Sequence, residues 1–404
     1  MVVLSRRRDP AGTIDALAPG HLRILINAMR TGVGAQGNAV YTRELVRGLG
    51  VLAGVDLHVL APSEQDRIWR RLAPHATIHA AVLAPHPLGL VSERRALKRI
   101  CAITRPEIFH SPNTLLPLWR PSCVTVVTVH DLGFRSLPQG ALKGLYKSAI
   151  YRYSALRADA LIAVSHHTEA TLLHHYPVTR GRVRVIWNGH PYTADWHPGQ
   201  SLLGQQTFVG DSKPYLLTFA HHRHKNAEAA VRALQVVQRS GFDVRLKVLG
   251  GNRSELTALT RLADGLGLSN CIDLLGYLEG DRELEALYRG ATALIFLSRY
   301  EGFGLPVLEA MAVGCPVVVS DRGSLPEIVS GLGCVVDPDN SELAADYVRR
   351  LLHEPEWALM QRSMAKCHAS QWTWQRSVGN TLELYRELKR ESQLRESSHA
   401  APPQ

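Results

Sequence analysis

The 404-residue sequence lacks any apolar run that approaches the roughly 18 residues a membrane-spanning helix needs. Its first twenty residues have no continuous apolar core, and their arginines follow the apolar residues, so they do not read as a secretory signal. The six cysteines include no C-x-x-C pair and no spacing typical of metal ligands. Free thiols in a reducing compartment fit this pattern, and we expect a cytoplasmic protein.

Acidic residues are fewer than basic residues in this chain. Lys and Arg number 46 against 36 Asp and Glu, which gives a formal net charge of +10. Such a surface favours anionic partners: nucleic acid, phosphate-bearing small molecules or anionic lipid. The chain contains no recognition helix, zinc finger or RNA-binding signature, so we expect no nucleic-acid partner.

Strand-like apolar runs alternate with segments of helical period along most of the chain. Alternation of this kind predicts parallel sheets covered by helices on both faces. Two series of about six units are too many for one sheet, so the sequence predicts an α/β protein with two doubly wound, Rossmann-like domains in tandem. The predicted strands are 22–27, 56–60, 108–110, 123–128, 160–164 and 184–187, then 215–219, 245–249, 272–275, 293–297, 316–319 and 333–336.

Composition also suggests the domain limits. A stretch rich in Gly, Pro and polar residues separates the two series, as a linker does. We therefore predict a disordered lead (1–20), a first domain (21–190), a linker (191–213), a second domain (214–371), a C-terminal helix that packs back on the first domain (372–394) and a disordered tail (395–404).

A glycine loop follows the first predicted strand. Gly32, Gly34 and Gly37 have the spacing G-x-G-x-x-G between a strand and a helix, the fingerprint of a dinucleotide site. A dehydrogenase also needs an acidic residue at the end of the second strand. Here Asp56 stands at the start of that strand and Glu64 lies beyond it, so the dinucleotide interpretation is disfavoured.

The most informative segment is "LSRYEGFGLPVLEAMAVGCPVVVSD" (297–321), which reads as strand, glycine loop, helix and strand. Ligands of such sheets bind just beyond the carboxyl ends of the strands. The backbone around Gly302 and Gly304 and the helix N-terminus behind it favour a phosphate or diphosphate. Glu309 can accept two hydrogen bonds from a ribose diol, whereas Glu301, eight residues earlier, would reach the other side of the phosphates.

These residues resemble the retaining nucleotide-sugar glycosyltransferases of family 4, which have the GT-B fold of two Rossmann-like domains facing across a cleft. The resemblance covers nearly the whole chain and follows the order of the family's motifs. These are "VVTVHDLGF" (126–134), "IAVSHHTEATL" (162–172), "VIWNGH" (185–190), "HRHKN" (222–226), "LLGYLEGDRELEALYRGA" (274–291) and "EGFGLPVLEAMAVGCPVV" (301–318).

The resemblance implies a role for each matching residue. Glu301 would contact the hydroxyls of the donor sugar and Glu309 the nucleotide ribose. Lys225 would bind the diphosphate, and His130 would face the donor sugar from the first domain. The remaining donor-site candidates are Arg223, whose register differs from the family's arginine, Tyr277, Ser298, and the loop Gly302, Phe303, Gly304 and Leu305. The Gly32–Gly34–Gly37 loop would face the cleft near the diphosphate and the acceptor.

Three other patterns have a less specific interpretation. His221, His222 and His224 lack the helical spacing or carboxylate partner of a metal site. Asp337 and Asp339 form a D-x-D beside Pro338, which reads as a turn. The basic stretches 93–99 and 143–157 fit helices with one packed face, and the alternative is contact with an anionic membrane.

The expected activity is transfer of a sugar from a nucleotide diphosphate sugar to an acceptor hydroxyl, with retained configuration. Lys225, Arg223 and the helix amides would stabilise the leaving diphosphate, so we expect no metal and no other cofactor. The expected partners are that donor and a carbohydrate or lipid-linked acceptor, with possible peripheral contact at an anionic membrane. Resemblance favours GDP-mannose over a UDP-sugar as the donor. The rivals are an NAD-dependent oxidoreductase, a sugar epimerase or phosphorylase, and a non-catalytic carbohydrate-binding protein on the same fold.

Overall fold

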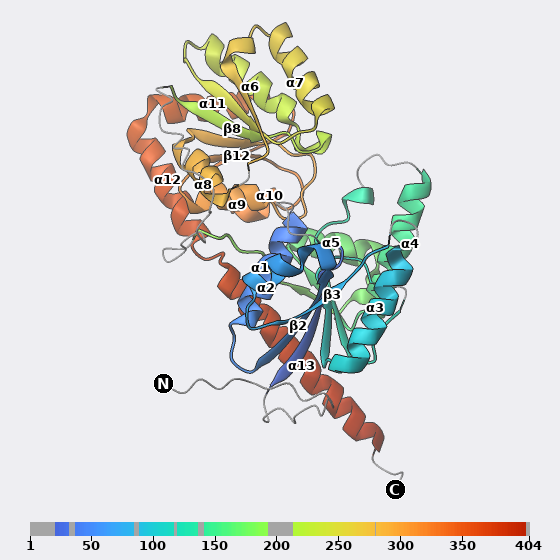
Figure 1. The fold of residues 1–404 in the computed structure, drawn as a ribbon. Coiled ribbons are helices and arrows are strands. Elements are labelled where there is room, and N and C mark those ends of the chain that lie inside the picture. Colours follow the sequence, from blue (N-terminus) through green and yellow to red (C-terminus); the bar gives the residue numbers. More distant parts are fainter. Residues whose placement is uncertain are drawn as a thin grey trace, which may run out of the picture.

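The computed structural model describes residues 21–31, 37–84, 89–116, 119–135, 141–192, 213–278 and 280–400. Within these ranges the chain forms two α/β units, each built on one parallel sheet (Figure 1). This confirms the predicted fold class of two doubly wound sheets. No helix in the described ranges is both long and apolar enough to cross a membrane. All six cysteines lie in these ranges, and each is a free thiol.

The first unit contains a seven-stranded sheet in the order β3-β2-β1-β4-β5-β6-β7. The strand order reverses between β1 and β4, which is the point where such sheets bind ligands. Ile24 of β1 aligns with Leu57 of β2 on one side and with Ile108 of β4 on the other. The strands are β1 (Leu22–Asn27), β2 (Val55–Pro62), β3 (Thr77–Ala81), β4 (Ile108–Ser111), β5 (Val124–Val129), β6 (Ala160–Ala163) and β7 (Val183–Val185).

Helices cover both faces of this sheet. Helix α5 begins where the sequence provides an N-cap, because the Ser165 hydroxyl accepts the backbone N–H of Thr168. Helix α1 turns Tyr41, Leu45 and Leu49 inward at helical spacing. The helices of this unit are α1 (Gly37–Gly50), α2 (Asp66–Leu72), α3 (Gly89–Thr104), α4 (Ala141–Arg157) and α5 (His166–His175), with short 3-10 turns η1 (Ser63–Gln65), η2 (Gly133–Arg135) and η3 (Pro177–Thr179).

The second unit contains a six-stranded parallel sheet in the order β10-β9-β8-β11-β12-β13, with its switch point between β8 and β11. Its central strands are fully buried apolar runs, as expected when helices cover both faces. The strands are β8 (Tyr215–Phe219), β9 (Arg245–Leu249), β10 (Ile272–Gly276), β11 (Ala293–Phe296), β12 (Val317–Ser320) and β13 (Cys334–Val336). The helical elements are η4 (Arg223–Lys225), α6 (Ala227–Arg239), α7 (Arg253–Gly265), η5 (Ser269–Cys271), α8 (Asp281–Gly290), α9 (Leu305–Ala312), α10 (Leu325–Val329), α11 (Ser341–His353) and α12 (Pro355–Ala369).

The last helix, α13 (Trp374–Ala400), returns to the first unit and runs beside α1 (Figure 1). Gly48 of α1 makes this approach possible, because a Cβ built there would lie 2.7 Å from a methyl of Val378. The buried hydroxyl of Tyr385 forms a hydrogen bond with Nδ1 of His110 in β4. The final helix therefore fastens the second unit to the sheet of the first.

Two features differ from the sequence-based predictions. The predicted tail 395–404 is wrong over its first part, because α13 continues to Ala400. Helix-favouring residues and the i,i+4 pair of Glu391 and Arg395 (3.5 Å) extend it. Strand β3 was not predicted: it is a short edge strand that pairs only with β2 and in which only Ile78 is fully buried.

Several predictions lie outside the described residues. These are the lead (1–20), most of the linker (193–212), the end of the tail (401–404), and Gly32 and Gly34 of the glycine loop. Gly37, the last glycine of that loop, is the first residue of α1.

Candidate functional site

Lys225 and Glu301 meet at the switch point of the second sheet. Lys225 ends the turn η4 that follows β8, and Glu301 follows β11, so both lie beyond the carboxyl ends of the two central strands. Lys225 Nζ lies 2.5 Å from Glu301 Oε1, and the two side chains are 17% and 10% exposed. The ammonium also lies 4.9 Å from the centre of the Phe296 ring. The arrangement presents a paired cation and anion at the place where this fold class binds ligands.

Asn226 positions Lys225. Its backbone adopts the left-handed conformation (φ 57°), which Asn tolerates better than most residues. Its buried side-chain amide donates to the carbonyls of Leu297 and Pro338, at 3.1 and 2.9 Å. The turn is further attached to the loop after β11, because the N–H of Arg299 donates to the carbonyl of His224 (2.7 Å). The two halves of the site are thus held to one another by hydrogen bonds to backbone carbonyls.

Helix α9 begins directly behind the Glu301 loop. Gly304 precedes it at φ 107°, a conformation that side chains rarely adopt, and Pro306 occupies its first turn. Glu309 lies half-buried on this helix and accepts a hydrogen bond from the Tyr288 hydroxyl (3.2 Å). Burial, reinforced by the charge of Glu309, raises the pKa of Tyr288 well above its usual value, so this hydroxyl stays a donor. Along the chain, Glu301 therefore precedes the N-terminus of α9, and Glu309 follows one turn into the helix.

Gly302 is one of the points where the two units touch. Its carbonyl accepts the hydroxyls of Ser165 (2.6 Å) and Thr168 (3.1 Å), both from the start of α5 in the first unit. A Cβ built on Gly302 would lie 1.9 Å from the carbonyl oxygen of His130. Only glycine permits this approach, so the loop that carries Glu301 is packed against the backbone of His130.

His130 follows β5 and faces the loop from the first unit. Its Nε2 donates to the carbonyl of Pro112 (2.7 Å), and since a carbonyl can only accept, Nδ1 of the neutral ring carries the lone pair. Burial lowers the pKa of His130, although the Pro112 carbonyl and Asp131 oppose the shift. The edge of the Tyr41 ring packs against it at 5.0 Å between centroids. His130 is therefore a neutral, oriented hydrogen-bond acceptor near pH 7.

Glu327 and Tyr300 join the two units and were not identified from the sequence. Glu327 of α10 accepts the indole N–H of Trp187 (2.6 Å) and the backbone N–H of His166 (3.0 Å), at the start of α5. The Tyr300 hydroxyl accepts the N–H of Leu132 (3.0 Å). Neither residue has a sequence signal for this role, because each partner lies more than a hundred positions away.

The other predicted donor-site residues occupy different positions. Arg223 is exposed, and no ion pair of its side chain occurs among the described residues. Ser298 is buried and donates to the His224 carbonyl (3.1 Å), so it supports the loop. Tyr277 is 64% exposed and packs on the ring of His221, 4.6 Å between centroids, at the same sheet edge.

Phe303 and Leu305, at the start of α9, do not point into the centre of the site. The Phe303 side chain is buried against the ring of Trp372, so only its backbone can face a ligand. Leu305 reaches the other unit: a Cβ built on Gly37 would lie 3.7 Å from its Cδ1. The end of the glycine loop is thus adjacent to the N-terminus of α9.

The histidines and aspartates that were considered as metal ligands make other contacts in the structure. The rings of His222 and His224 stack with their centres 5.6 Å apart. Asp337 pairs with Arg322 (2.8 Å) and Asp339 with Arg299. Within the described part of the chain, no three His, Cys, Asp or Glu side chains gather as a metal site would.

The basic stretches form α3 and α4. In α3, Glu93 and Leu97 point inward, whereas Arg94 and Arg99 are exposed, as expected for an amphipathic helix.

Comparison with known families identifies both units. A model of "Glycosyltransferase Family 4" matches residues 35–191, and a model of "Glycosyl transferases group 1" matches residues 204–368. The chain is 27% identical over 302 residues to the O-antigen chain mannosyltransferase B of Escherichia coli, covering 70% of this chain and 74% of that protein.

Solved structures show the same fold. Sucrose-phosphate synthase from Thermosynechococcus elongatus superposes with a TM-score of 0.72 at 20% identity, over 91% of this chain and 99% of that one. Anabaena HepE in complex with UDP and glucose superposes with a TM-score of 0.71 at 16% identity, over 91% of this chain and 100% of that one.

Proposed function

The chain belongs to the GT-B glycosyltransferases of the family 4 type, and from this premise we propose that it moves a hexose from a nucleotide diphosphate sugar to an acceptor hydroxyl with retention of configuration. It is thus an enzyme of the hexosyltransferase type. The observation that carries the proposal is the Lys225–Glu301 pair, 2.5 Å apart, in front of the N-terminus of α9.

The proposed donor spans this helix end. The diphosphate lies against the N-terminus of α9, where backbone N–H groups and the helix dipole favour negative charge. Glu309, half-buried farther along the helix, accepts the two ribose hydroxyls. Glu301, on the other side, accepts hydroxyls of the sugar. The spacing of the two carboxylates around one helix N-terminus supports this assignment.

Lys225 changes its partner when the donor binds. In the structure its ammonium is bound to Glu301. A diphosphate carries more negative charge than one carboxylate and competes for the ammonium. Lys225 then stabilises the charge that develops on the leaving diphosphate, and Glu301 is released toward the sugar. We propose that these groups suffice without a metal ion.

His130 completes the sugar side from the first unit. Its Nε2–H is taken by Pro112, so Nδ1 can accept a hydrogen bond from a sugar hydroxyl. Contacts of Gly302 with Ser165 and Thr168 close the units over this position, and closure excludes water that would hydrolyse the donor. We propose no protein general base for the acceptor.

We propose mannose as the sugar and a carbohydrate or lipid-linked polysaccharide precursor as the acceptor. The likeness to the O-antigen chain mannosyltransferase B of Escherichia coli supports both. The resemblance of "HSPN" (110–113), "TVHDL" (128–132) and "HKN" (224–226) to family members that use GDP-mannose supports a GDP-linked donor. Because HepE was solved with UDP and glucose, a UDP-sugar is the competing candidate for the donor.

Calorimetric titration with GDP, UDP, ADP and NAD, in EDTA, tests the proposal. We expect one nucleoside diphosphate to bind, GDP first, and Glu309→Ala to weaken it by at least about tenfold, since two charged hydrogen bonds are lost. Glu356→Ala, at an exposed position on α12, is the matched control and should bind as the wild type does. Binding of NAD with no diphosphate bound would overturn the proposal, and loss of binding in EDTA would overturn its metal-free form.

A further inference from the structure

Helices α3 and α4 present an exposed basic surface that takes no part in the proposed donor site. Leu97 of α3 and Ala155 of α4 belong to the same buried cluster, so both helices pack on one face of the first sheet (Figure 1). The exposed residues of each helix lie opposite these contacts and point away from the sheet in a common direction. We name the exposed residues of the two helices the α3–α4 surface.

This surface is basic and has no acidic residue to balance its charge. Helix α4 contains no Asp or Glu. The single carboxylate of α3, Glu93, is buried and accepts from Asn27 (2.9 Å) and Arg30 (2.5 Å) instead of facing outward. The exposed cations are Arg94, Arg95, Lys98 and Arg99 on α3 and Arg152 and Arg157 on α4.

The cations of the α3–α4 surface are also unpaired. Several exposed arginines on other helices have a carboxylate one turn away: Arg70 of α2 lies 2.8 Å from Asp66. Arg289 of α8 likewise lies 2.6 Å from Glu285. Among the residues that the structure describes, none of the six cations of the α3–α4 surface forms such a pair. Unbalanced charge of one sign on one face attracts a partner of the opposite sign.

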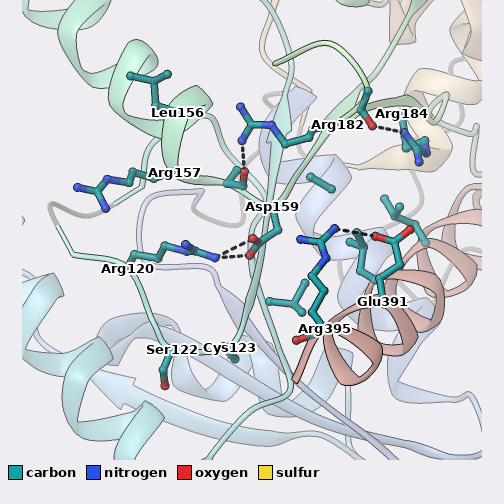
Figure 2. Close-up of a pocket in the computed structure, with 17 residues that line it drawn as sticks. Arg120, Ser122, Cys123, Leu156, Arg157, Asp159, Arg182, Arg184, Glu391 and Arg395 are labelled. Atoms are coloured by element: carbon teal, nitrogen blue, oxygen red, sulfur yellow. Dashed lines mark hydrogen bonds and ion pairs between the residues drawn. The ribbon is translucent and has the colours of Figure 1, made fainter. Parts of the chain in front are cut away.

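The end of α4 shows the direction of this surface. A polar cavity lies between α4, the amino ends of β5 and β6, and α13, and the guanidinium of Arg157 points away from it (Figure 2). This side chain lies near the ring of Tyr153, 5.9 Å from its centre. Arg157 therefore adds its charge to the outer face of α4.

Large apolar side chains lie among these cations. On α4, Leu145, Arg152 and Leu156 are exposed at the spacing i, i+7 and i+11, which places them on one line along the helix. Leu145 is 69% exposed, and Tyr146 beside it is 50% exposed. The exposed apolar residues of α3 are Val91 and Ile103. Basic and large apolar residues together on one helix face are typical of helices that lie on a membrane surface.

We propose that the α3–α4 surface docks on an anionic lipid bilayer. The cations would contact acidic headgroups, while the apolar side chains would enter the boundary between headgroups and acyl chains. A nucleic acid would use the cations but would leave the exposed leucines in water. A second copy of the chain would bring the same positive charges against this face, which opposes self-association through it.

Docking on this face would bring the edge of the sheet that carries His130 close to the membrane. Helix α3 follows β3 and α4 follows β5 and the turn η2, so both helices begin at the carboxyl edge of the sheet. Leu145 and Val91 lie near these N-terminal ends. An acceptor carried on a membrane lipid would thus be presented near His130. This consequence rests on the proposed function, whereas the docking itself does not.

Co-sedimentation of the full chain with vesicles tests the proposal. We expect binding to vesicles of phosphatidylglycerol and phosphatidylcholine that weakens as salt is added, and little binding to phosphatidylcholine alone. A variant with Arg95→Gln, Lys98→Gln and Arg152→Gln should bind about a hundredfold more weakly, since each basic residue at an anionic surface contributes about fivefold. The matched control removes the same charge from exposed positions on α2 and α6 and should bind as the wild type does; it carries Arg67→Gln, Arg71→Gln and Arg239→Gln.

A second variant tests the apolar part of the surface. Leu145→Ser with Leu156→Ser keeps every charge but should weaken vesicle binding by at least about tenfold, because less apolar surface leaves water. Leu359→Ser with Leu394→Ser, at exposed positions on α12 and α13, is its control and should bind as the wild type does.

Three results would overturn the proposal. These are no vesicle binding by the wild type, equal binding by the basic variant and its control, and retention on heparin without vesicle binding, which would assign the surface to a soluble polyanion. Titration of the same proteins with a nucleoside diphosphate reports the donor site separately and should be equal in all of them. Loss of nucleotide binding alone would therefore count against the proposed function, and loss of vesicle binding alone against this surface.

Discussion

Glu301→Gln should affect binding and catalysis in opposite directions. In the structure Glu301 holds the ammonium of Lys225 at 2.5 Å, so a nucleoside diphosphate has to draw that ammonium away from a carboxylate before it can use it. Glutamine keeps the shape but not the charge. The variant should bind the free nucleoside diphosphate more tightly than the wild type does, yet transfer sugar more slowly, because the proposed acceptor of the sugar hydroxyls is weakened.

The size of the gain follows from the burial of the pair. Exposed ion pairs contribute less than about 1 kcal/mol, whereas breaking a buried pair costs about 3–5 kcal/mol. The two side chains are 17% and 10% exposed, which lies between these limits. The amide can still accept one hydrogen bond from Lys225, so we expect about 1–2 kcal/mol, or about 5- to 30-fold tighter binding.

Two assays check this prediction. Calorimetry measures the affinity for the nucleoside diphosphate, and steady-state kinetics measures the transfer of sugar. Glu309→Gln is the contrasting variant: Glu309 accepts from the Tyr288 hydroxyl and is the proposed partner of the ribose, so this variant should lose affinity. If Glu301→Gln binds the nucleoside diphosphate as weakly as the wild type or more weakly, the competition between carboxylate and diphosphate for Lys225 is refuted.

Three further predictions concern other parts of the molecule. Gly302→Ala would set a Cβ 1.9 Å from the His130 carbonyl, so transfer activity should fall by about a hundredfold; near-normal kinetics would contradict the closed arrangement. Glu327→Ala removes a charged acceptor from the Trp187 N–H, and chemical denaturation should show about 1–3 kcal/mol less stability, whereas an unchanged midpoint would count against this contact. Burial lowers the pKa of His110 to about 3, so below its unfolded pKa near 6.5 the unfolded chain binds the extra proton and stability falls by about 1.4 kcal/mol per pH unit. Between pH 6.5 and 5 the stability of His110→Gln should therefore decline less steeply than that of the wild type, and parallel curves would refute the assignment.

The sequence by itself determined the two sheets and the local shape of the site. Buried strands are short apolar runs, and β1, β8 and β9 begin and end where the sequence predicts. Gly304 and Pro306 mark the start of α9 by their own backbone preferences. Such features depend on energies that act within a few residues, so periodicity and turn residues reveal them.

Contacts between distant residues were decided by the tertiary structure alone. Lys225 and Glu301 are separated by 76 positions, Gly302 and Ser165 by 137, and His110 and Tyr385 by 275. A polar cavity at the amino ends of β5 and β6 likewise gathers residues from 120 to 395. The periodicity of a short segment does not predict which of the many lysines or arginines will contact a given carboxylate. That choice comes from the way the sheets stack their strands and from the return of α13 onto the first unit, where packing of the whole chain fixes the partners.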